Sequence, residues 1–252
     1  RRCVVPHVFS NERGEIRLGE VGVVFYLKDL ADISEKTGDQ MKYRCEHDLI
    51  GRVRIKGVVN PEVFMTAETY LQVEVEDLED TDAEENLEES EEELYSRFEV
   101  LLELQEKLEE KVKCIPPGKL DAIRGSDKES REKVWELAGV WCDDFILMRT
   151  HDTMRAILFN LQTEFKKYYE ERGLRPPSKM DSSELPAELR DIVRSAQLRQ
   201  EEVMGAIEQM KTLRLQLVMS TSHKERIELL GAAVESEQKI LRAKIALSSV
   251  LE

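Results

Sequence analysis

The sequence predicts an α+β chain in which an antiparallel β-sheet precedes a long helical region. Up to about residue 80, apolar and polar side chains alternate with the period of two that is typical of strands. Beyond that point, apolar residues recur every three or four positions, which is the period of helices. Charged residues make up 35% of the chain and aromatic residues 6%, a composition that favours exposed helices over a large β-sandwich.

Four apolar runs predict the strands of an antiparallel meander. Turn-forming residues separate them, among them Gly14, Gly38 and Pro61. The runs cover residues 4–9, 21–27, 49–59 and 70–76. Because Arg1 stands directly before the first run, we expect further residues to precede it.

Acidity is concentrated in one segment. The chain has a formal net charge of -15, which argues against a nucleic-acid binder, since such proteins present basic surfaces. Residues 81–113 alone contain 13 Asp or Glu against 4 Lys or Arg, a net charge of -9. Two interpretations remain open, a solvated acidic face or a docking surface for a partner with a basic surface.

The first predicted helix follows an acidic linker over 77–93 and continues to about residue 112. Leucines recur in it every seven residues, which resembles a short coiled-coil seam, at Leu87, Leu94, Leu101 and Leu108. Gln105 interrupts the seam, and the alternative is an ordinary amphipathic helix packed within its own domain. Pro116 and Pro117 end the helix.

The second half of the chain is predicted to be all helical. A stretch from about Ser126 is apolar on several sides, so it should be buried, with Trp135 and Trp141 in the core rather than forming a ligand platform. Two long helices over about 187–219 and 224–251, joined by a turn at 221–223, predict an antiparallel hairpin. The predicted divisions are a β domain over 1–80, an acidic linker and helical subdomain over 81–172, a Pro/Ser loop over 173–186 and the hairpin over 187–252.

Motifs of common catalytic sites do not occur in the sequence. It contains no phosphate-binding Gly-x-x-x-x-Gly-Lys-Ser/Thr loop, no Gly-x-Ser-x-Gly elbow and no His-Glu-x-x-His pair. His151 and His223 have no accompanying nucleophile or carboxylate arrangement. We therefore expect no catalytic residues and no cofactor, in a chain that is not an enzyme. No apolar run approaches the length that crosses a bilayer.

One group of residues could hold a metal. Zinc accepts thiolate and imidazole ligands, which here would come from Cys3, His7, Cys45 and His47. The Cys-x-His spacing is an uncommon chelating geometry, however, so buried cysteines and surface histidines are the alternative. The four cysteines form no CxxC pair, which favours a reducing compartment over a disulfide framework.

Basic residues gather on one predicted strand face. Arg52, Arg54 and Lys56 alternate with apolar residues and could contact an acidic partner. Strand edges also carry basic residues because these discourage edge-to-edge pairing, and that interpretation stays open.

Several stretches carry a resemblance to a known family. They are Gly19-Glu20-Val21-Gly22-Val23-Val24, Gly51-Arg52-Val53-Arg54-Ile55, residues 70–78, and Ile115-Pro116-Pro117. In this order, and with an acidic connection into helices, they resemble the N-terminal substrate-binding (LON) domain of Lon proteases over roughly residues 1–150. The family's opening segment would lie before Arg1, and the sequence contains neither the ATPase nor the peptidase domain. It is most similar to stand-alone LON-domain proteins of plant and algal plastids, in residues 46–53 and 58–61.

The resemblance implies a LON-type β domain with its first strands missing, followed by a helical extension, in a chloroplast protein of the stroma or thylakoid surface. Together with the absence of catalytic motifs, the resemblance predicts a non-catalytic protein-protein interaction module, such as a scaffold, assembly factor or regulatory subunit of a larger plastid complex. The predicted partner contacts are Arg52, Arg54, Lys56, Leu87, Leu94, Leu101 and Leu108. The alternative is an adaptor that delivers polypeptides to a separate ATP-dependent protease.

Overall fold

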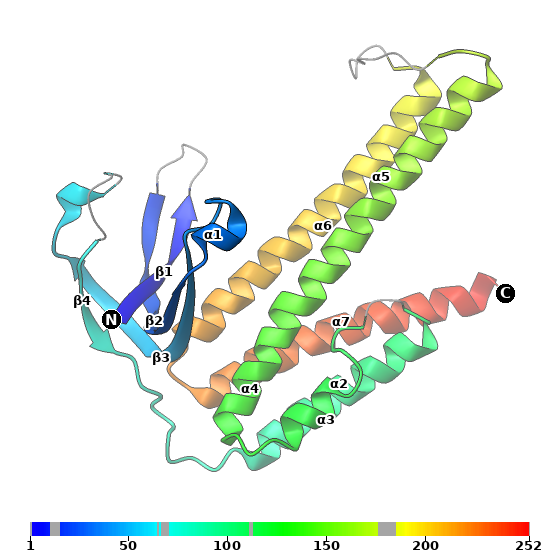
Figure 1. Ribbon diagram of the computed structural model, residues 1–252. Helices are drawn as coiled ribbons and strands as arrows, with labels where there is room; N and C mark the ends of the chain where they lie inside the picture. Colours follow the sequence, from blue (N-terminus) through cyan, green and yellow to red (C-terminus); the bar gives the residue numbers. More distant parts are fainter. Residues whose placement is uncertain are drawn as a thin grey trace. The chain divides into compact units, whose positions relative to one another are not determined.

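The computed structural model describes residues 2–10, 16–64, 66, 71–110, 113–175 and 185–251 (Figure 1). The description includes their side chains, except those of residues 7–10, 16, 143–149 and 249–251. The chain divides into two compact units. Unit 1 comprises Arg1–Glu85 and Leu215–Glu225, and unit 2 comprises Asn86–Arg214 and Arg226–Glu252.

Unit 1 is built on a four-stranded antiparallel sheet with the order β1-β2-β3-β4. Its strands are β1 (Arg2–Ser10), β2 (Ile16–Asp32), β3 (Tyr43–Val58) and β4 (Val73–Asp77). Each strand pairs with the next in sequence, so the predicted meander is confirmed. The strands β2 and β3 extend beyond their predicted runs, because pairing continues through the polar residues up to Asp32 and Tyr43. The helix α1 (Ser34–Thr37) joins these two strands, and the 3-10 turn η1 (Pro61–Val63) lies between β3 and β4.

The core of unit 1 is small. Its buried apolar side chains in the sheet are those of Val21, Val24 and Val53. Gly22 lets the neighbouring strands pack closely, since a Cβ atom there would lie 2.5 Å from Cγ1 of Val4 on β1 and 3.6 Å from Cδ1 of Ile55 on β3. Any larger residue at position 22 would therefore force the Val4 side chain, or β1 with it, to shift.

Unit 2 is helical (Figure 1). It contains α2 (Glu88–Lys107), α3 (Lys119–Arg124), α4 (Ser130–Gly139), the π-helical segment η2 (Val140–Phe145), α5 (Ile146–Glu171), and most of α6 (Ala187–Met219) and α7 (His223–Leu251). The bounds of α6 coincide with the predicted helix, and α7 begins one residue earlier than predicted. The sequence pattern did not predict α3. The coarse α+β layout, a sheet followed by helices, is confirmed.

The core of unit 2 lies largely between α2 and its neighbours. Leu94 and Leu101 are 1% and 0% exposed, and the ring of Phe98 packs edge-on against Trp141 with the centroids 5.6 Å apart. The seven-residue leucine spacing thus serves an internal face of α2 at these positions. Gln105, the polar break, is fully buried: its Oε1 accepts from the Cys114 backbone N–H at 2.9 Å, and its Nε2 donates to Glu110.

Two further contacts arrange the long helices of unit 2. The Gln238 side chain of α7 donates to the Arg97 carbonyl of α2 at 2.7 Å, and Arg97 pairs with Glu235 at 2.9 Å. Near the end of α5, Tyr169 clusters with Leu185 and with Leu189 of α6, where these two helices lie side by side (Figure 1). The predicted turn between the last two helices is present at residues 220–222, but α6 is paired along its first turns with α5.

None of the described helices is both long and apolar enough to cross a membrane.

Candidate functional site

Arg52 is held inside unit 1. Its Nη1 donates to the carbonyls of Val218 and Ser220 at 2.7 and 2.5 Å, and its Nη2 pairs with Asp80 at 2.6 Å. The side chain is only 13% exposed. The two carbonyls belong to the end of α6, where backbone acceptors lack partners within the helix and the dipole is negative. The end of α6 thus occupies the guanidinium of Arg52, and the predicted contact of this residue with a partner stays a prediction.

Asp82 binds the start of α7, as Arg52 binds the end of α6. Its carboxylate accepts from the backbone N–H groups of His223 and Lys224, each at 2.9 Å, and from the Ser222 hydroxyl at 2.8 Å. A carboxylate at a helix N-terminus satisfies unpaired donors and complements the positive end of the dipole. Arg52 and Asp82 therefore fasten the turn between α6 and α7 within unit 1. Their role there is structural.

The other predicted contact residues fall into two groups. Arg54 and Lys56 are exposed on β3, where Lys56 pairs with Glu76 of β4 at 3.1 Å. Leu87 and Leu108 are half-buried at the ends of α2. Partner binding by these four residues stays a prediction. Leu94 and Leu101 are buried in unit 2, so they belong to its core and not to an exposed seam.

The sheet register places the two candidate metal thiols apart. Cys3 lies opposite Phe25, which pairs with Leu49, whereas Cys45 lies opposite Leu30. His47 packs edge-on against Phe25 with the ring centroids 5.7 Å apart. The side chain of His7 lies outside the described part. Among the residues that the structure describes, no group of three or more His, Cys, Asp or Glu could hold a metal ion.

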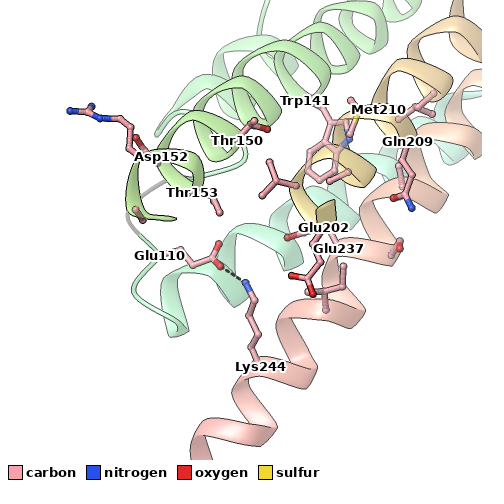
Figure 2. A pocket seen from close by; sticks show the side chains of 18 residues that line it. Glu110, Trp141, Thr150, Asp152, Thr153, Glu202, Gln209, Met210, Glu237 and Lys244 are labelled. Atoms are coloured by element: carbon pink, nitrogen blue, oxygen red, sulfur yellow. Dashed lines mark hydrogen bonds and ion pairs between the residues drawn. The ribbon is translucent and has the colours of Figure 1, made fainter. Parts of the chain in front are cut away.

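A cavity of about 1130 Å³ lies in unit 2 between α5, α6 and α7 (Figure 2). Figure 2 shows the side chains that line it, with Thr150, Asp152 and Thr153 from α5. Glu110, from the loop after α2, closes one side and pairs with Lys244 of α7 at 3.0 Å, the dashed line in Figure 2.

The cavity follows the helices as a groove. Its lining residues on α6 recur at spacings of three and four, so they share one helix face: Val203, Ala206, Met210 and Leu213. On α7 the lining runs from Ala233 through Ile240 to Lys244. The run on α6 spans about 15 Å and the run on α7 about 17 Å, at about 1.5 Å per residue. We call this cavity, lined by α5, α6 and α7, the three-helix groove.

The floor of the groove is apolar. Trp141, Met210 and Leu213 are buried there, and Figure 2 shows the Trp141 ring beside Met210. Trp141 is a core residue, as predicted, and it also forms part of the groove wall. Ile240 on the rim is 47% exposed, so apolar surface continues outward along α7.

Acidic groups outnumber basic ones around the groove. Its lining includes the carboxylates of Glu110, Asp152, Glu202 and Glu237, against the cations Arg155 and Lys244. The Glu110 ion pair already engages Lys244. Burial, together with the charge of Glu237, raises the pKa of the Cys114 thiol to about 12, so this buried thiol stays protonated and unreactive near neutral pH.

The lining is suited to binding. The polar groups of its lining are carboxylates, hydroxyls, one amide, the Trp141 indole N–H and two cations. The sequence did not predict this site, because an apolar stripe on a helix does not show whether it faces a core or a groove. The available signal was two small residues on the lining faces, Ala206 on α6 and Ala233 on α7, which leave space between helices.

Comparisons with known proteins gave no match: none was found among family models, curated proteins or solved structures. The resemblance to LON domains therefore stays a prediction that rests on the quoted motifs.

Proposed function

We propose that the chain is a non-catalytic protein-interaction module that binds a polypeptide segment in the three-helix groove. The groove itself carries this proposal. Its volume of about 1130 Å³ lies above the range of roughly 300–1,000 Å³ that suits drug-sized ligands. An apolar floor with a polar rim is the usual anatomy of a protein-binding surface.

We further propose the finer assignments that the sequence suggested. Unit 1 would be a LON-type β domain, and the module would serve as a scaffold, assembly or regulatory subunit in a plastid complex. The four-stranded meander and the motifs in β2 and β3 support this assignment. It is a likeness of fold, and fold by itself does not fix function.

The test uses a groove-filling variant and a matched control. Ala206 lies in the groove and is exposed, so Ala206→Trp should block the site and leave the core intact. Ala232 of α7 is also exposed but does not line the groove, so Ala232→Trp adds the same ring elsewhere. Each variant serves as bait in affinity capture with mass spectrometry. Ala206→Trp should lose partners that the unmodified chain captures, and Ala232→Trp should keep them. Equal partner lists from both baits would overturn the proposal.

Exposed apolar side chains in unit 1 favour the adaptor as a second candidate. Leu49, Val59 and Met41 are 66%, 65% and 59% exposed. Exposed apolar surface of this kind can hold unfolded chains. A permanently unfolded model protein should then bind at micromolar concentration, and Leu49→Ser should weaken that binding. Absence of binding to the unmodified chain would exclude the adaptor.

A further inference from the structure

We infer that the occupant of the three-helix groove is a cationic amphipathic helix of a partner protein. This inference rests on the proposed function and adds the chemistry of the partner. It joins three properties of the groove: its length along the helices, its apolar floor and its excess of carboxylates.

The shape of the groove fits a helix. Its lining on α6 runs from Glu202 to Leu213 and on α7 from Ala233 to Lys244, so it extends for about three turns beside both helices. An amphipathic helix of similar length would lay its apolar residues over Met210 and Leu213, as helices do in hydrophobic grooves of other proteins.

The charge of the groove selects the polar face of that helix. Asp152 on α5 and Glu202 on α6 are exposed at the groove, and Glu237 stands on α7. Lysines or arginines flanking the apolar stripe of the partner would meet these carboxylates from either side. An acidic helix would meet like charges, which suppress binding.

The net charge of the protein argues against a second copy of this chain as occupant. At -15 the chain would repel itself, and its acidic segment at residues 81–113 lies partly on α2 and on the loop that reaches the groove at Glu110. A basic partner is attracted by the same field. Association should therefore weaken as salt rises, because exposed charges are screened.

The test measures binding of three model peptides to the full chain by fluorescence anisotropy. One is a Leu/Lys amphipathic helix of about 12 residues, which matches three turns. The second replaces its lysines with glutamates, and the third scrambles the Leu/Lys order and so destroys the apolar stripe. We expect the first to bind and the other two to bind at least tenfold more weakly.

Charge variants test where the first peptide binds. The double variant Asp152→Asn/Glu202→Gln removes two groove carboxylates on exposed positions. The matched control Glu164→Gln/Glu201→Gln changes exposed residues of the same two helices outside the groove. We expect the dissociation constant of the Leu/Lys peptide to rise about 2- to 30-fold for the groove variant, because two exposed ion pairs are lost. It should stay unchanged for the control.

The results can distinguish failure of the proposed groove function from failure of the cationic-helix inference. If Ala206→Trp abolishes binding but the Leu/Glu peptide binds as well as the Leu/Lys peptide, the groove stands and the cationic partner is refuted. If the Leu/Lys peptide binds equally to every variant, it binds elsewhere and the inference fails. If no peptide binds and Ala206→Trp bait retains every partner, both ideas fail. Sedimentation equilibrium showing a dimer that Ala206→Trp dissociates would assign the groove to a second copy instead.

Discussion

Arg52 and Asp82 complement the two helix ends that meet near residues 219–223. Arg52 covers the carbonyl end of α6 and Asp82 the N–H end of α7, each with three hydrogen-bonded contacts inside unit 1. Each charge is thus opposite in sign to the end of the helix dipole that it faces. Because these groups are largely buried, the loss of either partner removes hydrogen bonds that water replaces poorly, which costs more than the bond itself contributes.

At the residue scale, Arg52→Ala should destabilise the chain. Removal of the guanidinium takes away its ion pair with the Asp80 carboxylate, which is 16% exposed, and its hydrogen bonds to the two carbonyls at the end of α6. We expect a loss of about 2–4 kcal/mol in the free energy of unfolding, measured by urea denaturation. The exposed Arg54→Ala is the control and should change it by less than about 0.5 kcal/mol. Equal effects of the two substitutions would contradict the internal role of Arg52.

The buried thiol of Cys114 should make stability depend on alkaline pH. Burial first, and the charge of Glu237 second, raise its pKa from 9.0 to about 12. Above pH 9 the unfolded chain releases the thiol proton while the folded chain retains it, so stability falls as pH rises from 9 to 12. Below pH 9 this contribution is fully present.

The measurement compares the chain with Cys114→Ala by urea denaturation between pH 8 and pH 10.5. The free energy of unfolding of the unmodified chain should fall more steeply with pH, by up to about 1 kcal/mol per pH unit above 9. A difference between the two proteins that stays constant across this range would show that the thiol does not titrate differently on unfolding.

At the element scale, α2 shows how one leucine pattern can serve an internal face. Leu101 is fully buried beside Phe98, whereas Leu108 is half-buried at the helix end. Leu101→Ala should therefore cost about 3 kcal/mol in the free energy of unfolding, and Leu108→Ala about 1 kcal/mol or less. Thermal or chemical denaturation of both variants checks this. Similar small costs at both positions would instead favour an exposed seam that needs a partner.

At the scale of the whole molecule, unit 1 is discontinuous in sequence. Its sheet and acidic linker are completed by residues 215–225, which come from the ends of two helices of the second half. A division at residue 80 separates Arg52 from Val218 and Ser220. It also excludes Asp82, which binds the start of α7. Unit 1 is therefore larger than the apolar strand pattern alone suggests.

A fragment of residues 1–85 should accordingly be less stable than the same fragment joined to residues 215–225 through a flexible linker. The joined version restores the helix-end partners of Arg52 and Asp82. We expect dispersed amide signals by NMR and a cooperative denaturant transition for the joined fragment, and a weaker transition at lower denaturant for the short one. Two indistinguishable transitions would show that residues 215–225 do not stabilise the sheet.

Local patterns in the sequence determined the elements of this protein. Alternation with a period of two indicated the four strands and their meander order, and helical periodicity indicated the bounds of α6, because backbone geometry repeats over short distances along the chain. The sequence also indicated where the acidity lies. It showed neither η2 nor α3, since short or irregular helical turns leave little periodicity to detect.

Only the tertiary structure decided which faces meet. Arg52 binds carbonyls 166 and 168 residues away, and the three-helix groove takes its lining from segments that no local pattern connects. The α6 stripe through Val203 and Met210 resembled core in sequence because core and groove require the same apolar spacing. The difference lies in whether a neighbouring helix fills the space beside that stripe, and this depends on packing between helices distant along the chain.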